Sequence, residues 1–188
     1  MESIAIGLSS SELQTKLGAI ESLVGRLEKG KRGCILEATN NETKKKIYSS
    51  SVNLLKDVNT KVVHPAFGIV SALIDDPAFQ NLKAITFDIL LVKFGDAKPQ
   101  VRSRASEVMA KLVMSHGDAA GCDKLLSTVN LGHRNGRVRE HLLHTLTLLI
   151  EMHDCNISSK VDVIKKVASL LNDSQPTVRQ VAVETLGG

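Results

Sequence analysis

The chain has 188 residues, a formal net charge of +4 and an isoelectric point near 9, so it is mildly basic. Apolar residues make up 43% and aromatic residues only 3%, with no Trp, which predicts a core of aliphatic side chains. Three cysteines without a CxxC spacing argue against a disulfide framework, and the sequence shows neither a signal peptide nor an apolar run of transmembrane length, so we expect a cytoplasmic protein.

The first periodic segment begins at Leu13. Apolar residues at Leu13, Leu17, Ile20 and Val24 follow steps of four, three and four, which predicts one face of an α-helix. We interpret this segment as a lone leading helix. Residues 28–43, which are rich in Gly and Asn, are expected to form a loop.

The same steps recur in four later copies. Each copy is anchored by a valine that lies five residues after an Asp or, once, a His. The anchors are Val62, Val101, Val138 and Val178, separated by 39, 37 and 40 residues. A period near forty is typical of an α-solenoid, in which each helical pair buries its apolar face against its neighbours. We therefore expect an all-α solenoid of about five repeats, the first and last incomplete, as one domain over residues 1–188.

The first helix of each later pair is less regular. Pro77 and Pro176 predict helix starts, because the first helical residue has no intrahelical partner for its N–H. Ser158, Ser159 and Asp118 are expected to cap helices. Gly187 is expected to end the last helix early, so that the chain stops inside a repeat. The predicted first helices are 44–56, 77–94, 119–131 and 158–171.

The turn inside each pair carries the repeated phrase. We expect Asp57, Asp96 and Asp173 to accept hydrogen bonds from the N–H groups that open the next helix. Because stacked repeats share one orientation, their turns should follow one edge, and a basic edge fits an extended acidic partner. Alternatively, the Asp and Arg side chains bond each other and join adjacent repeats. The expected basic edge consists of Lys61, Lys98, Arg102, Arg134, Arg137, Arg139 and Arg179.

Other chemistry finds little support in the sequence. His141 and His144 are three residues apart on one predicted helix, and residues 153–155 form a His-Asp-Cys cluster, but no further ligand is spaced to complete a zinc site. Walker, Rossmann and nucleophile-elbow motifs do not occur. We therefore expect no cofactor, no metal and no enzymatic activity. With few aromatics and modest charge, we also expect no nucleic-acid or membrane partner and a monomeric domain.

Three of the turn phrases resemble a known family. Residues 94–102, 133–140 and 171–179 resemble the intra-repeat turns of TOG domains from microtubule regulators, which are HEAT-repeat solenoids. The phrase His-Arg…Val-Arg-Glu at 133–140 is most similar to that of the CLASP branch. The resemblance covers residues 8–186 and corresponds to an N-terminal TOG array.

The resemblance implies a flat paddle whose intra-repeat turns bind the side of an αβ-tubulin dimer or the microtubule lattice. Leu13 stands where the family normally places an aromatic residue against β-tubulin, and Arg179 is implied to face the α-subunit. The implied tubulin-binding residues are Leu13, Asn59, Thr60, Lys61, Lys98, Arg102, Arg134, Arg137 and Arg179.

The implied function is regulation of microtubule dynamics, by stabilisation, rescue or spindle organisation, as part of a larger protein. The implied location is the microtubule cytoskeleton, including the spindle or kinetochore. A generic HEAT-repeat scaffold that binds other proteins is the alternative, and an enzyme is a third interpretation.

Overall fold

The computed structural model describes residues 1–29, 39–115, 118–152 and 160–187, and helices joined by turns make up this part of the chain. No β-strand occurs in these ranges. The chain forms two compact units, Met1–Ile89 (unit 1) and Leu90–Gly188 (unit 2). None of the described helices combines the length and hydropathy that a membrane span requires.

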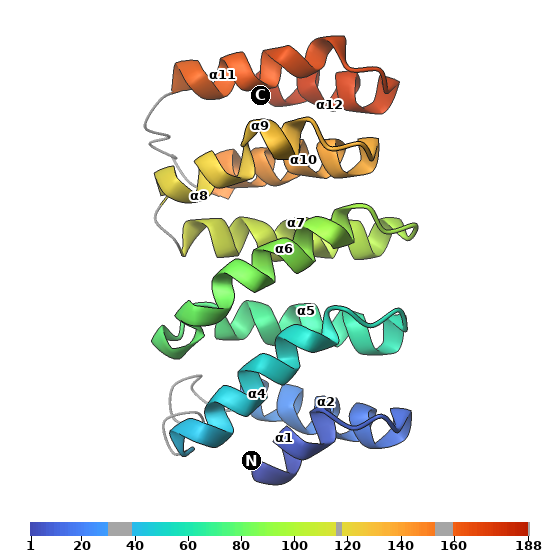
Figure 1. Ribbon diagram of the computed structural model, residues 1–188, viewed down its shortest axis with the longest axis vertical. Helices are drawn as coiled ribbons and strands as arrows, with labels where there is room; N and C mark the ends of the chain where they lie inside the picture. Colours follow the sequence, from blue (N-terminus) through green and yellow to red (C-terminus); the bar gives the residue numbers. More distant parts are fainter. Residues whose placement is uncertain (30–38, 116–117, 153–159, 188) are drawn as a thin grey trace. The chain divides into compact units, whose positions relative to one another are not determined.

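Unit 1 contains two helical pairs, in which α2 packs on α5 and α1 packs on α4 (Figure 1). A 3₁₀ helix and the first half of α6 complete the unit. Its elements are α1 (Glu2–Leu8), α2 (Leu13–Lys29), α4 (Asn41–Leu54), α5 (Thr60–Leu73), η1 (Pro77–Leu82) and α6 (Lys83–Phe94).

The prediction of a lone leading helix is wrong. Residues Glu2–Leu8 form α1, which buries Ile4, Ala5 and Leu8 and packs against α2 and α4. A helix of two turns is too short to show a clear apolar period, and tertiary packing stabilises it instead. The first pair is therefore present, with a short first helix.

Unit 2 stacks three long second helices, with α10 packed between α7 and α12 (Figure 1). The aliphatic core that packs against α12 includes Leu143, Leu146, Val167 and Leu170, which are at most 6% exposed. Its further elements are α7 (Pro99–Met114), α8 (Asp118–Leu125), α9 (Thr128–Leu131), α10 (Gly136–Met152), α11 (Lys160–Ser169), η2 (Leu170–Asn172) and α12 (Pro176–Gly187).

The repeated apolar pattern is confirmed as the core face of the second helices. The four anchor valines, Val62, Val101, Val138 and Val178, are at most 2% exposed. Burying one such side chain contributes about 1.5–3 kcal/mol, so the pattern marks the principal stabilising contacts. Leu13 differs, because it begins α2 and is 40% exposed.

Three of the predicted first helices are interrupted. The segment 77–94 divides into η1 and α6, and 119–131 divides into α8 and α9. The last predicted helix, 158–171, is described from Lys160 and ends in the 3₁₀ helix η2. The predicted caps Ser158 and Ser159 lie outside the described residues, as does the side chain of Asp118, the first residue of α8.

The break between α8 and α9 has a local cause. Ser127 caps α9 by accepting a hydrogen bond of 3.3 Å from the Asn130 N–H. The Asn130 side chain turns back and donates to the carbonyl oxygens of Lys124 (2.8 Å) and Leu125 (3.3 Å). These bonds satisfy carbonyls at the end of α8 that an uninterrupted helix would satisfy through its own backbone.

The helix starts at the two prolines are confirmed. Asp76 precedes Pro77 and accepts a hydrogen bond from the Ala78 N–H at 2.8 Å. The same carboxylate pairs with Lys44 at 2.8 Å and accepts from the Tyr48 hydroxyl at 2.8 Å, which anchors η1 to α4. Within the expected loop at 28–43, α2 continues to Lys29 and Asn40 caps α4, whereas residues 30–38 lie outside the described residues.

Candidate functional site: the intra-repeat turns

The turns inside the helical pairs share one hydrogen bond. The carboxylates of Asp57, Asp96 and Asp173 each accept from the backbone N–H two residues later, at 2.8 Å. His133 replaces the Asp in one copy, and its Nδ1 accepts from the Asn135 N–H at 3.1 Å. The bond therefore orders the turn itself.

The expectation that the Asp side chains cap the helices is wrong in detail. The N–H that each one binds belongs to the residue just before the helix, so the cap is a separate residue. Asn59 and Asn135 are caps, because their side-chain oxygens accept from the N–H groups of Lys61 and Arg137 at 3.0 Å. Lys98 makes no side-chain cap, and Pro99 then begins α7.

In unit 1, the structure places the predicted residues at two neighbouring turns. Leu13 and Lys61 are exposed, Thr60 is half-buried as the first residue of α5, and Asn59 is engaged in capping. The turn before α5 lies close to the start of α2, since Lys16 Nζ is 3.4 Å from Asp57 Oδ2.

A hollow of about 410 Å³ lies between these two turns of unit 1. Its lining includes Lys16, Lys56 and Asp57 together with serine side chains. Lys16 and Asp57 form an ion pair of 3.4 Å, so the charge of Lys16 is compensated. Hydrogen bonding from the Asn59 N–H, supplemented by Lys16, lowers the pKa of Asp57 and keeps the carboxylate ionised.

In unit 2, three turns lie in a row. Gly95 of the turn before α7 is so close to the next turn that an added Cβ would meet Asn135 Nδ2 at 2.8 Å. Gly136, the first residue of α10, is equally close to Gln175 of the last turn, whose Cγ would be 2.7 Å away. Figure 1 shows these three turns on the same side of unit 2.

An open hollow of about 580 Å³ lies at the second and third turns of unit 2. Three arginines line it: Arg102 is half-buried, whereas Arg134 and Arg137 are exposed. Glu140 is the one acidic residue among the lining residues. Lys98 is also exposed, in the first of the three turns. The excess of guanidinium groups suits carboxylate or other anionic partners, which these groups can bind through paired hydrogen bonds.

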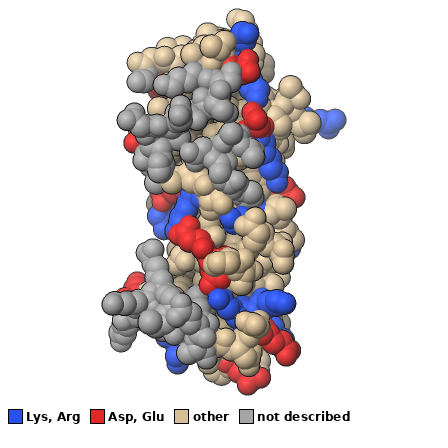
Figure 2. Space-filling model, turned by 90° about the vertical axis from the view of Figure 1, so that its left-hand side faces the viewer, with Lys and Arg blue, Asp and Glu red and all other residues tan. Residues whose placement is uncertain are grey.

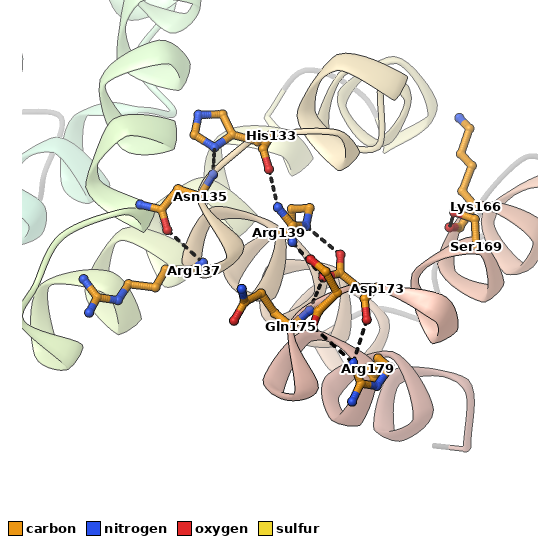
Figure 3. Close-up of polar contacts among 10 residues, drawn as sticks. His133, Asn135, Arg137, Arg139, Lys166, Ser169, Asp173, Gln175 and Arg179 are labelled. Atoms are coloured by element: carbon orange, nitrogen blue, oxygen red, sulfur yellow. Dashed lines mark hydrogen bonds and ion pairs between the residues drawn. The ribbon is translucent and has the colours of Figure 1, made fainter.

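Arg139 does not contribute to a free basic edge, and this part of the prediction is wrong. The side chain is 8% exposed, and its Nε and Nη2 donate to the two carboxylate oxygens of Asp173 at 2.6 and 2.7 Å (Figure 3). Its Nη1 donates to the His133 carbonyl. The Arg139 guanidinium, helped by the Gln175 N–H, lowers the pKa of Asp173. Arg139 therefore joins the last two turns.

The guanidinium groups of Arg137 and Arg179 differ from that of Arg139 and from each other in what they contact. In Figure 3 the Arg137 guanidinium points away from the Arg139–Asp173 pair, and the dashed line at this residue ends on its backbone nitrogen. Arg179 is half-buried, and its Nη1 donates to the carbonyls of Asp173 (2.7 Å) and Ser174 (3.3 Å). Arg179 thus keeps a cationic group at the turn while helping to order the backbone.

Figure 2 shows one face of the molecule, on which both acidic and basic side chains occur among the residues drawn in colour. Among the described residues that line the hollow of unit 2, three are arginines and one, Glu140, is acidic. The turns therefore remain the stronger candidates for binding an acidic partner.

Sequence reasoning did not identify the close packing at Gly95 and Gly136, or the hydrogen bond from Arg102 to His141. Arg102 and His141 are 39 residues apart, close to the repeat period, and this spacing is the signal that could have related them. The glycines carried no such signal, because the contacts that require them come from neighbouring repeats.

No protein-family model matches the chain, and no curated protein matches it in sequence. Solved structures do match in fold. The MAST/Orbit N-terminal domain is 22% identical, with a TM-score of 0.80 over 99% of this chain and 81% of that domain. The Drosophila melanogaster Mini spindles TOG3 domain is 18% identical, with a TM-score of 0.77 over 98% of this chain and 79% of that one.

A third similar structure comes from microtubule polymerases that recruit and assemble tubulin through arrays of tumor overexpressed gene (TOG) domains. It is 20% identical, with a TM-score of 0.72 over 97% of this chain and 38% of that chain. These similarities confirm the all-α HEAT-repeat solenoid fold of the TOG type. At such low identity they establish the fold and leave binding to be argued from this chain's own side chains.

Proposed function

We propose that this chain is a tubulin-binding TOG domain that regulates microtubule dynamics as part of a larger protein. The observation that carries the proposal is the hollow of unit 2, where Arg102, Arg134 and Arg137 gather between two ordered turns. The structurally similar microtubule polymerases recruit tubulin through TOG domains, which supports the same class of partner here. The expected activity is binding, without chemical turnover.

Unit 1 contributes a second contact surface in this proposal, formed by Leu13, Asn59, Thr60 and Lys61. Leu13 offers an exposed apolar side chain, and Lys61 offers an exposed cation. Lys98 and Arg179 extend the surface of unit 2. Asn59 acts chiefly through the helix cap that positions Lys61. We further propose that residues 1–188 act as a single monomeric domain on cytoplasmic microtubules, the spindle or kinetochore included.

Assignment to the CLASP branch is part of the same proposal. Its support is the phrase at residues 133–140, in which His133 replaces the Asp of the other turns. His133 preserves the turn by accepting the Asn135 N–H, so the replacement is compatible with the shared geometry. This finer assignment predicts that another CLASP-like chain would tolerate His in place of Asp at the equivalent position of the turn.

The test is binding to free αβ-tubulin and to microtubules, measured side by side by light scattering after gel filtration and by co-sedimentation. We expect Arg137→Glu to weaken binding by about tenfold, equivalent to about 1.4 kcal/mol. Lys165→Glu is the matched control, because Lys165 is an exposed cation on α11, outside the turns. It should change binding less than twofold.

The outcome that contradicts the proposal is a folded parent chain with no affinity for tubulin in either form. That result would favour the generic HEAT-repeat scaffold. Equal weakening by Arg137→Glu and Lys165→Glu would show that net charge, and not the hollow, controls binding.

A further inference from the structure

Arg102 and Arg139 hold equivalent places, one residue after an anchor valine, but their guanidinium groups end on different partners. Both donate Nη1 to carbonyl oxygens of their own turn, at 2.9 Å to Asp96 in the case of Arg102. The Arg139 Nε donates to the Asp173 carboxylate at 2.6 Å. The Arg102 Nε instead donates to Nε2 of His141 at 3.0 Å.

The bonds around His141 define its protonation state. Nε2 must be unprotonated in order to accept the Arg102 Nε–H. The Ser106 hydroxyl donates to the Arg102 carbonyl at 3.2 Å, so its oxygen is left to accept from Nδ1–H of His141, 3.1 Å away. One tautomer of a neutral imidazole satisfies all three bonds.

The environment of the ring favours this neutral form. His141 is 7% exposed and Ser106 is 2% exposed. The Phe94 ring lies 6.0 Å from the imidazole, and the His144 ring lies 5.1 Å from it. Burial, then the neighbouring His144 and Arg102, lower the pKa of His141 to about 4. The imidazole is therefore neutral at pH 7.

We infer that His141 is a positioning residue for partner binding: its neutral ring fixes the Arg102 guanidinium at the hollow without forming an ion pair with it. The inference rests on the proposed function for the identity of the partner. Asp173 fixes Arg139 in the same way but neutralises it, and Arg139 is buried. A neutral acceptor thus separates orientation from charge compensation, and the oriented cation suits a carboxylate of an acidic protein surface.

Three substitutions distinguish these two effects. His141→Gln keeps an acceptor for Arg102 and a donor for Ser106, without charge. His141→Leu removes both. His141→Glu supplies a carboxylate that can hold Arg102 as Asp173 holds Arg139, and it compensates the charge.

The first measurement is hydrogen exchange of the Arg102 Nε–H by ¹⁵N NMR on the full chain without tubulin, with Arg102→Lys to assign the signal. We expect slow exchange in the parent, in His141→Gln and in His141→Glu. We expect exchange at least tenfold faster in His141→Leu. Unchanged exchange in a folded His141→Leu chain would overturn the inference. If His141→Leu does not fold, the inference would be overturned by an Arg102 Nε–H that exchanges as fast in His141→Gln as in a free arginine.

The second measurement is affinity for αβ-tubulin. His141→Gln should bind within about twofold of the parent, whereas His141→Glu should bind about tenfold more weakly although Arg102 stays ordered. In an Arg102→Ala background, His141→Glu should weaken binding less than it does in the parent, because no Arg102 charge remains to be compensated. Full affinity in His141→Glu would overturn the role of the uncompensated charge. A parent chain that fails to bind tubulin would contradict the proposed function alone, because the exchange data test the positioning separately.

Discussion

The two hollows at the turns differ in how their charges are arranged. In unit 1, Lys16 is paired with Asp57, and Lys56 is the other cation in the lining. In unit 2, three arginines share the lining with Glu140, and the Arg139–Asp173 pair is buried apart from them. The difference shows that one repeated phrase can produce either a compensated or an uncompensated turn, depending on the neighbouring repeat.

The largest expected effect is the difference in stability lost when each of the two ion pairs, Arg139–Asp173 and Lys16–Asp57, is broken. Asp173→Asn leaves the buried Arg139 guanidinium without its anion, so the free energy of unfolding should fall by about 3 kcal/mol. Asp57→Asn, in the more exposed pair with Lys16, should cost under about 1 kcal/mol. Urea unfolding of both variants measures the contrast. Equal losses would show that the two pairs contribute alike.

Lowering the pH should remove the stability that the Arg139–Asp173 ion pair contributes. The Arg139 guanidinium lowers the folded-state pKa of Asp173, so the ion pair contributes its stabilisation in full above the unfolded-state pKa of about 4. The stabilisation is lost as the pH falls through the folded-state pKa. The difference in stability between the parent and Asp173→Asn should therefore narrow from pH 7 towards pH 3.

The next effect compares the hollows as binding surfaces. Arg134→Glu should weaken tubulin binding by about tenfold, because it places an anion among the arginines of unit 2. Lys56→Glu, the matching charge reversal in unit 1, should weaken binding by about two- to threefold, since the charges there are already partly paired. Titration of labelled tubulin gives both values. A stronger effect at Lys56 would reverse the assignment of the main basic surface.

The smallest effect concerns backbone packing. Gly136→Ala places a Cβ against Gln175 and should cost about 1 kcal/mol by overpacking. Gly25→Ala, inside α2 with open space around it, should instead stabilise unit 1 by about 0.5–1 kcal/mol. Thermal unfolding distinguishes the opposite signs. A gain from Gly136→Ala would show that the turn can move away from Gln175 at little cost.

Much of the fold could be predicted because its signals are local. The anchor valines, such as Val101, and the proline at Pro176 act within one helix, so spacing and residue type were sufficient. The first helix, Glu2–Leu8, was missed because packing against α2 and α4 stabilises it. The break at Ser127 was missed because it depends on the bonds that the Asn130 side chain makes to the end of α8.

The candidate site was predictable in its residues but not in their states. Arg102 and Arg139 occupy the same place in the repeated phrase, one residue after an anchor valine. Their partners, His141 and Asp173, lie 39 and 34 residues away. Whether an arginine is free to bind is decided by contacts between repeats, which a single phrase does not encode.

The shared turn bond has a consequence for the speed and selectivity of association. Because each Asp or His holds the backbone two residues ahead, the cations that follow already stand on ordered backbone before a partner arrives. Binding then loses little chain entropy, and rigid-body docking is sufficient. Such a surface discriminates by shape, since it cannot remould itself around a poorly matched spacing of acidic groups.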